Sequence, residues 1–115
     1  MSFVPVAELA ELDEGPLGVE VDHSTEGPLP VVLVRLPDGE VHALLDECSH
    51  GAVMLSEGDF DLEEHNIECY LHGSRFDICT GAALTPPATA PIPVYPVRVE
   101  DDQVFVDVEN PTKEN

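Results

Sequence analysis

The stretch of sequence that decides the fold runs from Cys48 to Thr80 and reads CSHGAVMLSEGDFDLEEHNIECYLHGSRFDICT. It contains two short motifs, CSH at residues 48–50 and CYLH at residues 69–72, with eighteen residues between them. Each motif offers one thiolate and one imidazole, which are ligands that suit transition metals. Two such motifs predict a four-ligand metal site. Each motif combines one sulfur ligand with one nitrogen ligand, and this favours a metal centre whose two ends differ chemically.

Two kinds of metal centre use this set of ligands. In a [2Fe-2S] centre of one type, two cysteines hold one iron and two histidines hold the other. A structural zinc ion instead binds two cysteines and two histidines in tetrahedral geometry, although zinc motifs more often pair like with like, as in CxxC followed by HxxxH. The pattern therefore favours the iron-sulfur centre, with zinc as the alternative.

The flanks of the two motifs resemble those of Rieske-type 2Fe-2S ferredoxins, the ferredoxin components of bacterial aromatic-ring-hydroxylating dioxygenases. The matching pattern is CxHG, then CxxHGxRFDxxTG, then a Pro-rich loop and YPVRVE. It is carried by Cys48, His50, Gly51, Cys69, His72, Gly73, Arg75, Phe76, Asp77, Thr80, Gly81, Tyr95, Pro96, Val97, Arg98, Val99 and Glu100. A weaker similarity extends over nearly the whole chain.

The resemblance implies an all-β fold, a Rieske iron-sulfur domain built as an antiparallel β-sandwich. We expect a single domain over residues 1–115, because this length is typical of one domain. Two β-hairpin loops are expected to form a small cluster-binding subdomain at approximately residues 46–82. A Pro-rich loop at approximately residues 85–93 is expected to cover one side of the centre.

The resemblance also assigns roles to single residues. One 2Fe-2S cluster per chain is expected to be bound by four ligands, namely Cys48, His50, Cys69 and His72. Around these ligands, Gly51 and Gly73 are expected to allow close backbone approach. Ser74 matches a serine that donates a hydrogen bond toward a bridging sulfide, and Phe76 replaces a tyrosine that donates to a cluster cysteine.

Two further positions differ from the Rieske subunits of respiratory and photosynthetic cytochrome complexes. Those subunits resemble this chain but carry an extra cysteine in each loop, and the two cysteines form a disulfide. Val53 and Leu71 occupy the matching positions here, so that disulfide is impossible. Together with Phe76, this predicts a midpoint in the low half of the Rieske range of roughly -150 to +300 mV.

The rest of the chain predicts short strands joined by turns. β-Branched residues on both sides of a Pro-Asp-Gly turn indicate a hairpin of residues 31–36 and 40–45. Other segments expected to be extended are the edge strand 2–6 and the strands 17–22, 66–70, 75–78, 94–99 and 103–108. We also expect a helical turn at residues 7–12, a loop at 22–30 and apolar anchors at Met54, Leu55 and Phe60.

The net charge of -20 excludes two classes of partner. Nucleic acids and anionic membranes are bound through Lys and Arg, and this chain has four of these residues against twenty-four Asp and Glu. The acidity has two interpretations. It maintains solubility or reflects adaptation to salt, or it steers the protein toward a basic docking surface on a partner.

The remaining cysteine and histidines are expected to have no role in the metal site. Cys79 has no intramolecular disulfide partner once Cys48 and Cys69 are ligands, which fits a reducing compartment. We expect His23 to be solvated, His42 to point out of its sheet and His65 to be a surface residue. The N-terminus has acids where a signal peptide would be basic, and no apolar run reaches eighteen residues, so we expect a cytoplasmic protein.

Three functions are compatible with these features. The resemblance favours a soluble one-electron carrier, not an enzyme, that passes electrons from an NAD(P)H-dependent flavin reductase to a terminal oxygenase. The first alternative is a Rieske-like small subunit of a cytosolic reductase such as assimilatory nitrite reductase. The second is a zinc-stabilised interaction module. The sequence shows no arrangement of nucleophile and base that would support catalysis.

Overall fold

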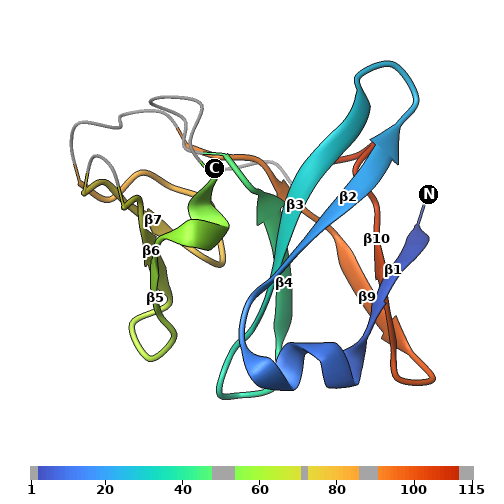
Figure 1. Ribbon diagram of the computed structural model, residues 1–115, viewed down its shortest axis with the longest axis horizontal. Coiled ribbons are helices and arrows are strands. Elements are labelled where there is room, and N and C mark those ends of the chain that lie inside the picture. The colour runs from blue at the N-terminus through green and yellow to red at the C-terminus, as the bar shows by residue number, and fades with distance from the viewer. Residues whose placement is uncertain (1–2, 48–53, 71–72, 86–90, 112–115) are drawn as a thin grey trace.

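The computed structural model describes residues 3–47, 54–70, 73–85 and 91–111 (Figure 1). The strands in these ranges are β1 (Val4–Glu8), β2 (Leu17–His23), β3 (Gly27–Arg35), β4 (Val41–Leu45), β5 (Asp59–Asp61), β6 (Asn66–Glu68), β7 (Arg75–Asp77), β8 (Val94–Tyr95), β9 (Val97–Glu100) and β10 (Gln103–Val106). Two 3-10 helices are present, η1 (Leu9–Glu14) and η2 (Leu55–Glu57). Neither of these described helices has the length and apolar character needed to cross a membrane.

The strands form three antiparallel sheets, with the orders β1-β10-β9, β2-β3-β4-β8 and β5-β6-β7. In Figure 1 the two larger sheets form the right-hand part of the molecule, and the small sheet stands apart on the left. Every strand pairing among the described residues is antiparallel. The prediction of an all-β antiparallel fold is confirmed.

The four-stranded sheet is buried on both faces and therefore separates two cores. The sandwich core lies toward the β1-β10-β9 sheet and includes Val31, Leu33, Ala43, Tyr95, Val104 and Val106. The site core lies toward the small sheet and includes Val32, Val34, Leu44, Leu55, Ile67, Cys69, Phe76, Ile78 and Val94. Because side chains alternate along a strand, residues 31–34 of β3 serve both cores in turn and are fully buried.

The hairpin predicted from the Pro-Asp-Gly turn is confirmed as β3 and β4. The predicted loop at residues 22–30 is wrong, because Asp22 pairs with Pro28 and Glu20 pairs with Pro30 in the β2-β3 ladder. Proline lacks a backbone donor but keeps its acceptor. The carbonyl oxygen of Pro30 accepts a hydrogen bond from the Asp46 amide at 2.9 Å, so the proline carbonyl still joins two strands.

Three other predictions need correction. Residues 94–99 form two strands instead of one, since β8 pairs with β4 and β9 with β10, with Pro96 between them. β5 was not predicted; its Phe60 pairs with Ile67 of β6. Leu55 is fully buried, as expected, but Met54 is 44% exposed and does not anchor the segment.

At the N-terminus, the edge strand is confirmed with shifted bounds, as β1 at the edge of its sheet. The helical turn is a 3-10 helix that begins two residues later than expected, at Leu9. It ends at Gly15, which has a φ of 123°.

Candidate metal centre

The second ligand motif begins at the end of β6, where Cys69 closes a tight turn. The Cys69 amide donates to the carbonyl oxygen of Ser74 at 2.8 Å, and the Gly73 amide donates to the carbonyl oxygen of Cys69 at 2.8 Å. Gly73 has a φ of 74°, a left-handed conformation that favours glycine. Cys69 and Ser74 are both fully buried. The backbone therefore holds the Cys69 side chain at a fixed position against the site core.

The two ends of the first motif's segment are tied together. Asp46, just before it, accepts a hydrogen bond through Oδ1 from the amide of Ser56, just after it, at 2.6 Å. Ser56 belongs to η2, and Gly58 at the end of η2 lies against β6. A Cβ atom at Gly58 would stand 2.0 Å from the carbonyl oxygen of Glu68, which directly precedes Cys69. Asp46 and Glu68, which precede the two predicted ligand motifs, therefore both lie against η2 or its last residue.

Both ends of the Pro-rich loop are also anchored at this end of the molecule. At its start, Thr85 Oγ1 accepts from the amide of Arg75 on β7 at 2.9 Å. At its other end, Pro93 accepts through its carbonyl oxygen from the amide of Leu45 on β4 at 3.0 Å. The loop therefore begins on the small sheet and returns to the four-stranded sheet. The described residues Thr85 and 91–93 form neither helix nor strand, as the prolines predict.

The structure describes four of the eight residues expected at the site. Cys69, Gly73, Ser74 and Phe76 lie together around the β6-β7 turn, and Phe76 is fully buried opposite Ile67 in the ladder. The other four lie outside the described residues, namely Cys48, His50, Gly51 and His72. Their roles as ligands or neighbours of the centre stay predictions.

A second group of potential ligands lies at the far end of the small sheet. The Cys79 Sγ atom is 3.8 Å from Nε2 of His42 and 4.0 Å from Nδ1 of His65. Burial raises the pKa of the Cys79 thiol, and the carboxylates of Asp77, Glu40 and Asp38 raise it further. No group of three or more His, Cys, Asp or Glu residues among the described positions has a geometry that could hold a metal ion. This thiol is therefore kept protonated in a half-buried site.

The other three histidines, His23, His42 and His65, are all partly buried and none is fully solvated. His42 is half-buried, and its Nε2 atom lies 3.1 Å from Glu40 Oε1. His23 accepts hydrogen bonds at Nδ1 from the amides of Thr25 and Glu26, both at 3.1 Å, so its ring shapes the β2-β3 turn.

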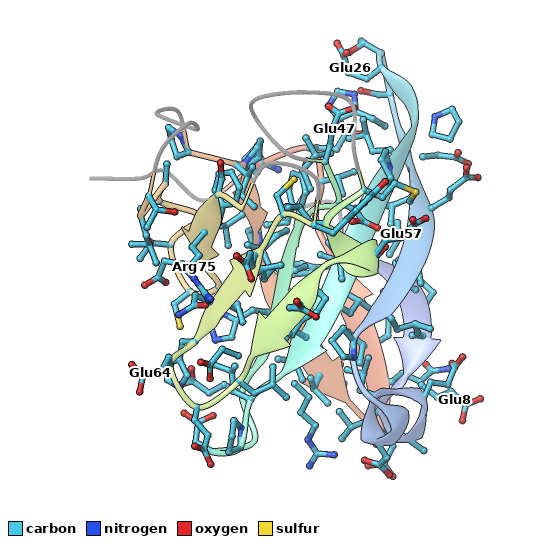
Figure 2. All side chains as sticks on the ribbon, turned by 60° about the vertical axis from the view of Figure 1, so that its left-hand side comes forward. Glu8, Glu26, Glu47, Glu57, Glu64 and Arg75 are labelled. Carbon is cyan, nitrogen blue, oxygen red and sulfur yellow. The ribbon has the colours of Figure 1, made fainter. Side chains whose placement is uncertain are left out.

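Carboxylates dominate the surface of the described residues. Figure 2 shows the labelled Glu8, Glu26, Glu47, Glu57 and Glu64 on different sides of the molecule. The three arginines in the described ranges are each paired with an acid. Their shortest contacts are 3.0 Å for Arg35 with Asp13, 3.5 Å for Arg75 with Glu68 and 3.4 Å for Arg98 with Glu100. This part of the surface therefore offers no free basic patch.

Sequence reasoning missed Asp46, the one buried carboxylate next to a ligand motif. It is 1% exposed and stands two residues before Cys48, at the end of β4. The signal was present, because an acidic residue at the end of an apolar strand and directly before a metal motif is an unusual core residue. Its partner Ser56 is ten residues away, and only the fold shows their contact.

The described residues fit a [2Fe-2S] group. Cys69 has a thiol of the kind that would hold such a cluster, and it lies among apolar side chains of the site core. The backbone of Cys69, Gly73 and Ser74 is fixed in a tight turn by two hydrogen bonds between amides and carbonyl oxygens. The described residues that flank the two ligand motifs and the Pro-rich loop lie at the same end of the fold.

Comparisons with known proteins agree with this assignment. The family model for the Rieske [2Fe-2S] domain matches residues 2–96. The ferredoxin component of the naphthalene 1,2-dioxygenase system of Pseudomonas aeruginosa is 39% identical over 107 residues, which is 92% of this chain and 95% of that protein. The ferredoxin subunit of 3-phenylpropionate/cinnamic acid dioxygenase from Escherichia coli (strain K12) is 36% identical over 108 residues, 94% of this chain and 95% of its own.

Solved structures agree as well. A chain in a complex of reduced oxygenase and oxidized ferredoxin in carbazole 1,9a-dioxygenase superposes with a TM-score of 0.81 and 29% identity, covering 96% of this chain and 97% of its own. The family match favours iron-sulfur over zinc and implies one 2Fe-2S cluster as the cofactor. The chain belongs to the Rieske [2Fe-2S] domain family.

Proposed function

We propose that this protein is a one-electron carrier that receives electrons from an NAD(P)H-dependent flavin reductase and passes them to the terminal oxygenase of an aromatic-ring dioxygenase system. The observation that carries the proposal is the alignment with ferredoxin components over 92% and 94% of this chain and 95% of theirs. The protein itself transforms no organic substrate. Its task is to bind a redox group and present it to two partners in turn.

The proposed ligands are Cys48, His50, Cys69 and His72, with the two sulfurs on one iron and the two nitrogens on the other. When bound, the [2Fe-2S] group supplies a one-electron couple with a potential between roughly -150 and +300 mV. The chain holds this group between two segments rooted at η2. Gly51 and Gly73 would allow close backbone approach, Ser74 would donate a hydrogen bond toward the group, and Phe76 would supply an apolar wall without a hydroxyl donor.

The proposed docking surface lies around the two ligand segments. Three exposed apolar side chains border them in sequence or in space, namely Met54 at 44%, Tyr70 at 56% and Leu84 at 50% exposure. Leu84 is held beside β7 because its amide donates to the Arg75 carbonyl oxygen at 2.7 Å. Acidic residues stand near two of these side chains in the sequence, Glu57 near Met54 and Glu68 near Tyr70. A partner with an apolar centre and a basic rim would complement this surface in shape and charge.

The proposed arrangement is a single domain over residues 1–115, with a cluster-binding subdomain at approximately 46–82 and the covering loop at approximately 85–93. The small sheet and η2 both fall inside the proposed subdomain. The proposed location is the cytoplasm. A chain with three cysteines, two of them ligands, is suited to a reducing compartment.

The ligand assignment is tested by spectroscopy of purified protein reconstituted under anaerobic conditions. We expect electron paramagnetic resonance of a [2Fe-2S] centre after reduction, and a midpoint in the low half of the Rieske range. Cys48→Ser, His50→Ala, Cys69→Ser and His72→Ala should each lose that signal. His23→Ala is the matched control and should keep it, because its ring shapes a turn in the sandwich. Colourless wild-type protein, or an unchanged spectrum after either ligand histidine is replaced, would refute the assignment.

The role as a carrier is tested separately, by mixing reduced protein with a terminal oxygenase of the naphthalene type and following reoxidation. We expect oxidation of the carrier with one electron transferred per chain. Protein that has the expected spectrum but exchanges no electrons with a reductase or an oxygenase of this class would contradict the proposed function while leaving the cofactor assignment intact.

A further inference from the structure

Asp46 is a buried carboxylate at the junction between the sandwich and the segment that carries the first ligand motif. The residue is 1% exposed. Its amide donates to the carbonyl oxygen of Pro30 on β3 at 2.9 Å, and its Oδ1 accepts from the amide of Ser56 at 2.6 Å. At 2.6 Å this contact lies at the short end of N–H···O hydrogen bonds. One side of the residue is thus fixed to the four-stranded sheet and the other to η2.

The second carboxylate oxygen faces β2. A Cβ atom at Gly18 would lie 3.4 Å from Asp46 Oδ2 and 3.6 Å from Ser56 Oγ, so these three residues meet in one place. No donor in the described part of the chain reaches Oδ2. In Figure 1 the yellow-green coil of η2, which includes Ser56, lies between β4 and the small sheet. Gly18 leaves the room that the carboxylate occupies.

A carboxylate is a costly choice for this position. A buried charge that lacks part of its hydrogen bonds is destabilising, and an amide of the same shape would still accept from Ser56. The hydrogen bond from Ser56 therefore explains why residue 46 has an acceptor in its side chain. It does not explain why that side chain is a carboxylate instead of an amide. Asp46 is separated by one residue from Cys48, and two peptide units span at most about 7.6 Å between Cα atoms. The charge is thus held close to a proposed ligand.

We propose that Asp46 is a positioning residue for the iron-sulfur centre, which fixes the start of the first ligand segment against η2 and holds a negative charge that lowers the reduction potential. The inference rests on the proposed ligand role of Cys48. A nearby negative charge opposes the arrival of an electron. At a separation of about 10 Å and an effective dielectric constant of about 20, one charge changes a one-electron equilibrium by about tenfold. That factor corresponds to about 59 mV.

The chain offers a matched control in Asp107, a second fully buried aspartate. Its Oδ1 accepts from the Glu109 amide and its Oδ2 from Asn110 Nδ2, both at 3.0 Å. Its chain neighbours Val106 and Val108 pack in the sandwich core and not in the site core. Asp46→Asn and Asp107→Asn remove the same charge from the same chain, so their difference reports the position of the charge.

The experiment measures iron and sulfide content, the paramagnetic resonance of the reduced protein and its midpoint potential. Asp46→Asn should keep the centre and favour the reduced form by about tenfold, a rise of about 59 mV. Asp107→Asn should leave the potential near that of wild type. Asp46→Ala removes the acceptor as well, and should lower the iron content and alter the resonance signal.

A third variant tests the effect of the charge through a shift of the potential in the opposite direction. Ser56→Pro removes the amide that donates to Oδ1, and proline is tolerated in the first turn of a helix. The Asp46 carboxylate then keeps its charge but loses the hydrogen-bond donor that partly offsets it. The midpoint potential of the centre should therefore fall. If Asp46→Asn folds without iron although it keeps the acceptor for Ser56, the inference is overturned. Equal potentials in Asp46→Asn and Asp107→Asn, or in Ser56→Pro and wild type, would overturn the inference. Wild-type protein without the resonance signal would instead refute the ligand assignment.

Discussion

At the scale of single residues, Cys79 shows how surroundings decide the chemistry of a thiol. The thiolate is the reactive form of cysteine, and burial together with three carboxylates raises the pKa of Cys79 above its ordinary value of 9.0. The neighbouring imidazoles of His42 and His65 do not reverse this shift. The thiol therefore stays protonated at neutral pH, even though two nitrogen atoms lie within 4.0 Å.

We expect Cys79 to react with iodoacetamide at pH 8 more slowly than the same cysteine in the unfolded chain. Peptide mass spectrometry after timed alkylation of the iron-loaded protein measures this rate. Glu40→Gln removes one of the carboxylates that raise the pKa and should speed the reaction. Glu26→Gln, in the β2-β3 turn, is the control and should not. Alkylation of the native protein as fast as that of the unfolded chain would contradict this account.

At the scale of elements, the turn after β7 depends on a glycine that is caught between strands. Gly81 has a φ of 79°, and a Cβ atom there would stand 2.1 Å from the carbonyl oxygen of Ile92. The same two residues share a hydrogen bond, from the Ile92 amide to the Gly81 carbonyl oxygen at 2.9 Å. This contact fixes the returning end of the Pro-rich loop against the small sheet.

Gly81→Ala should therefore lower the free energy of unfolding by about 3 kcal/mol, as a steric clash is added to the backbone strain. Gly27→Ala is a matched control, because Gly27 has a similar φ of 76° but nothing within 4 Å of a Cβ atom. It should cost only about 1 kcal/mol, the backbone strain alone. Urea unfolding followed by circular dichroism measures both. Equal losses of stability would show that Gly81 is not closely packed.

A second contact between elements joins the β2-β3 turn to the C-terminal segment. Glu109 accepts from the side chain and the amide of Ser24, both at 2.7 Å, and His23 Nε2 lies 3.6 Å away. These hydrogen bonds, chiefly the one from the Ser24 side chain, lower the pKa of Glu109 below 4.5. A carboxyl group with a lowered pKa stabilises the fold above its ordinary pKa, and this contribution disappears as the pH falls through the lowered value.

Glu109→Gln should accordingly have a lower melting temperature than wild type at pH 7. The difference should shrink as the pH falls from about 4.5, the ordinary value, through the lowered pKa. Differential scanning calorimetry across pH 3 to 7 measures the melting temperature of both proteins. The other acids titrate in both, so their effect cancels in the difference between wild type and variant. A difference that stays constant across that range would show that the charge of Glu109 contributes nothing to stability.

The elements that sequence reasoning located are those set by local patterns. A continuous apolar run at residues 31–34 followed by a Pro-Asp-Gly turn specifies the β3-β4 hairpin without any distant partner, and Gly39 supplies the positive φ of that turn. β5 carries only one apolar side chain, Phe60, and becomes a strand because Ile67 pairs with it. The ligand motifs are local in sequence, whereas the contact between Asp46 and Ser56 depends on how η2 packs, which no local pattern records.

At the scale of the whole molecule, the charge of -20 constrains every encounter with a partner. Each arginine of the described residues is paired with an acid, so none of these arginines stands as an isolated positive charge. Electrostatic steering depends on the screening length, which is about 30 Å at 10 mM salt and about 3 Å at 1 M. The two interpretations of the acidity therefore predict opposite responses to salt.

If the acids steer docking, the second-order rate of electron transfer to the oxygenase should fall at least about tenfold between 10 mM and 1 M salt. If they serve adaptation to salt and the partner is acidic as well, the rate should rise instead, because screening relieves repulsion. Stopped-flow mixing across this range separates the two. Leu84→Ser should slow the transfer at every salt concentration without changing the slope, since it removes apolar contact but no charge. Val4→Ser, at an exposed position on β1, is the control for that variant. A salt-independent rate in the wild type would mean that the acids act on neither docking nor repulsion, leaving solubility as their role.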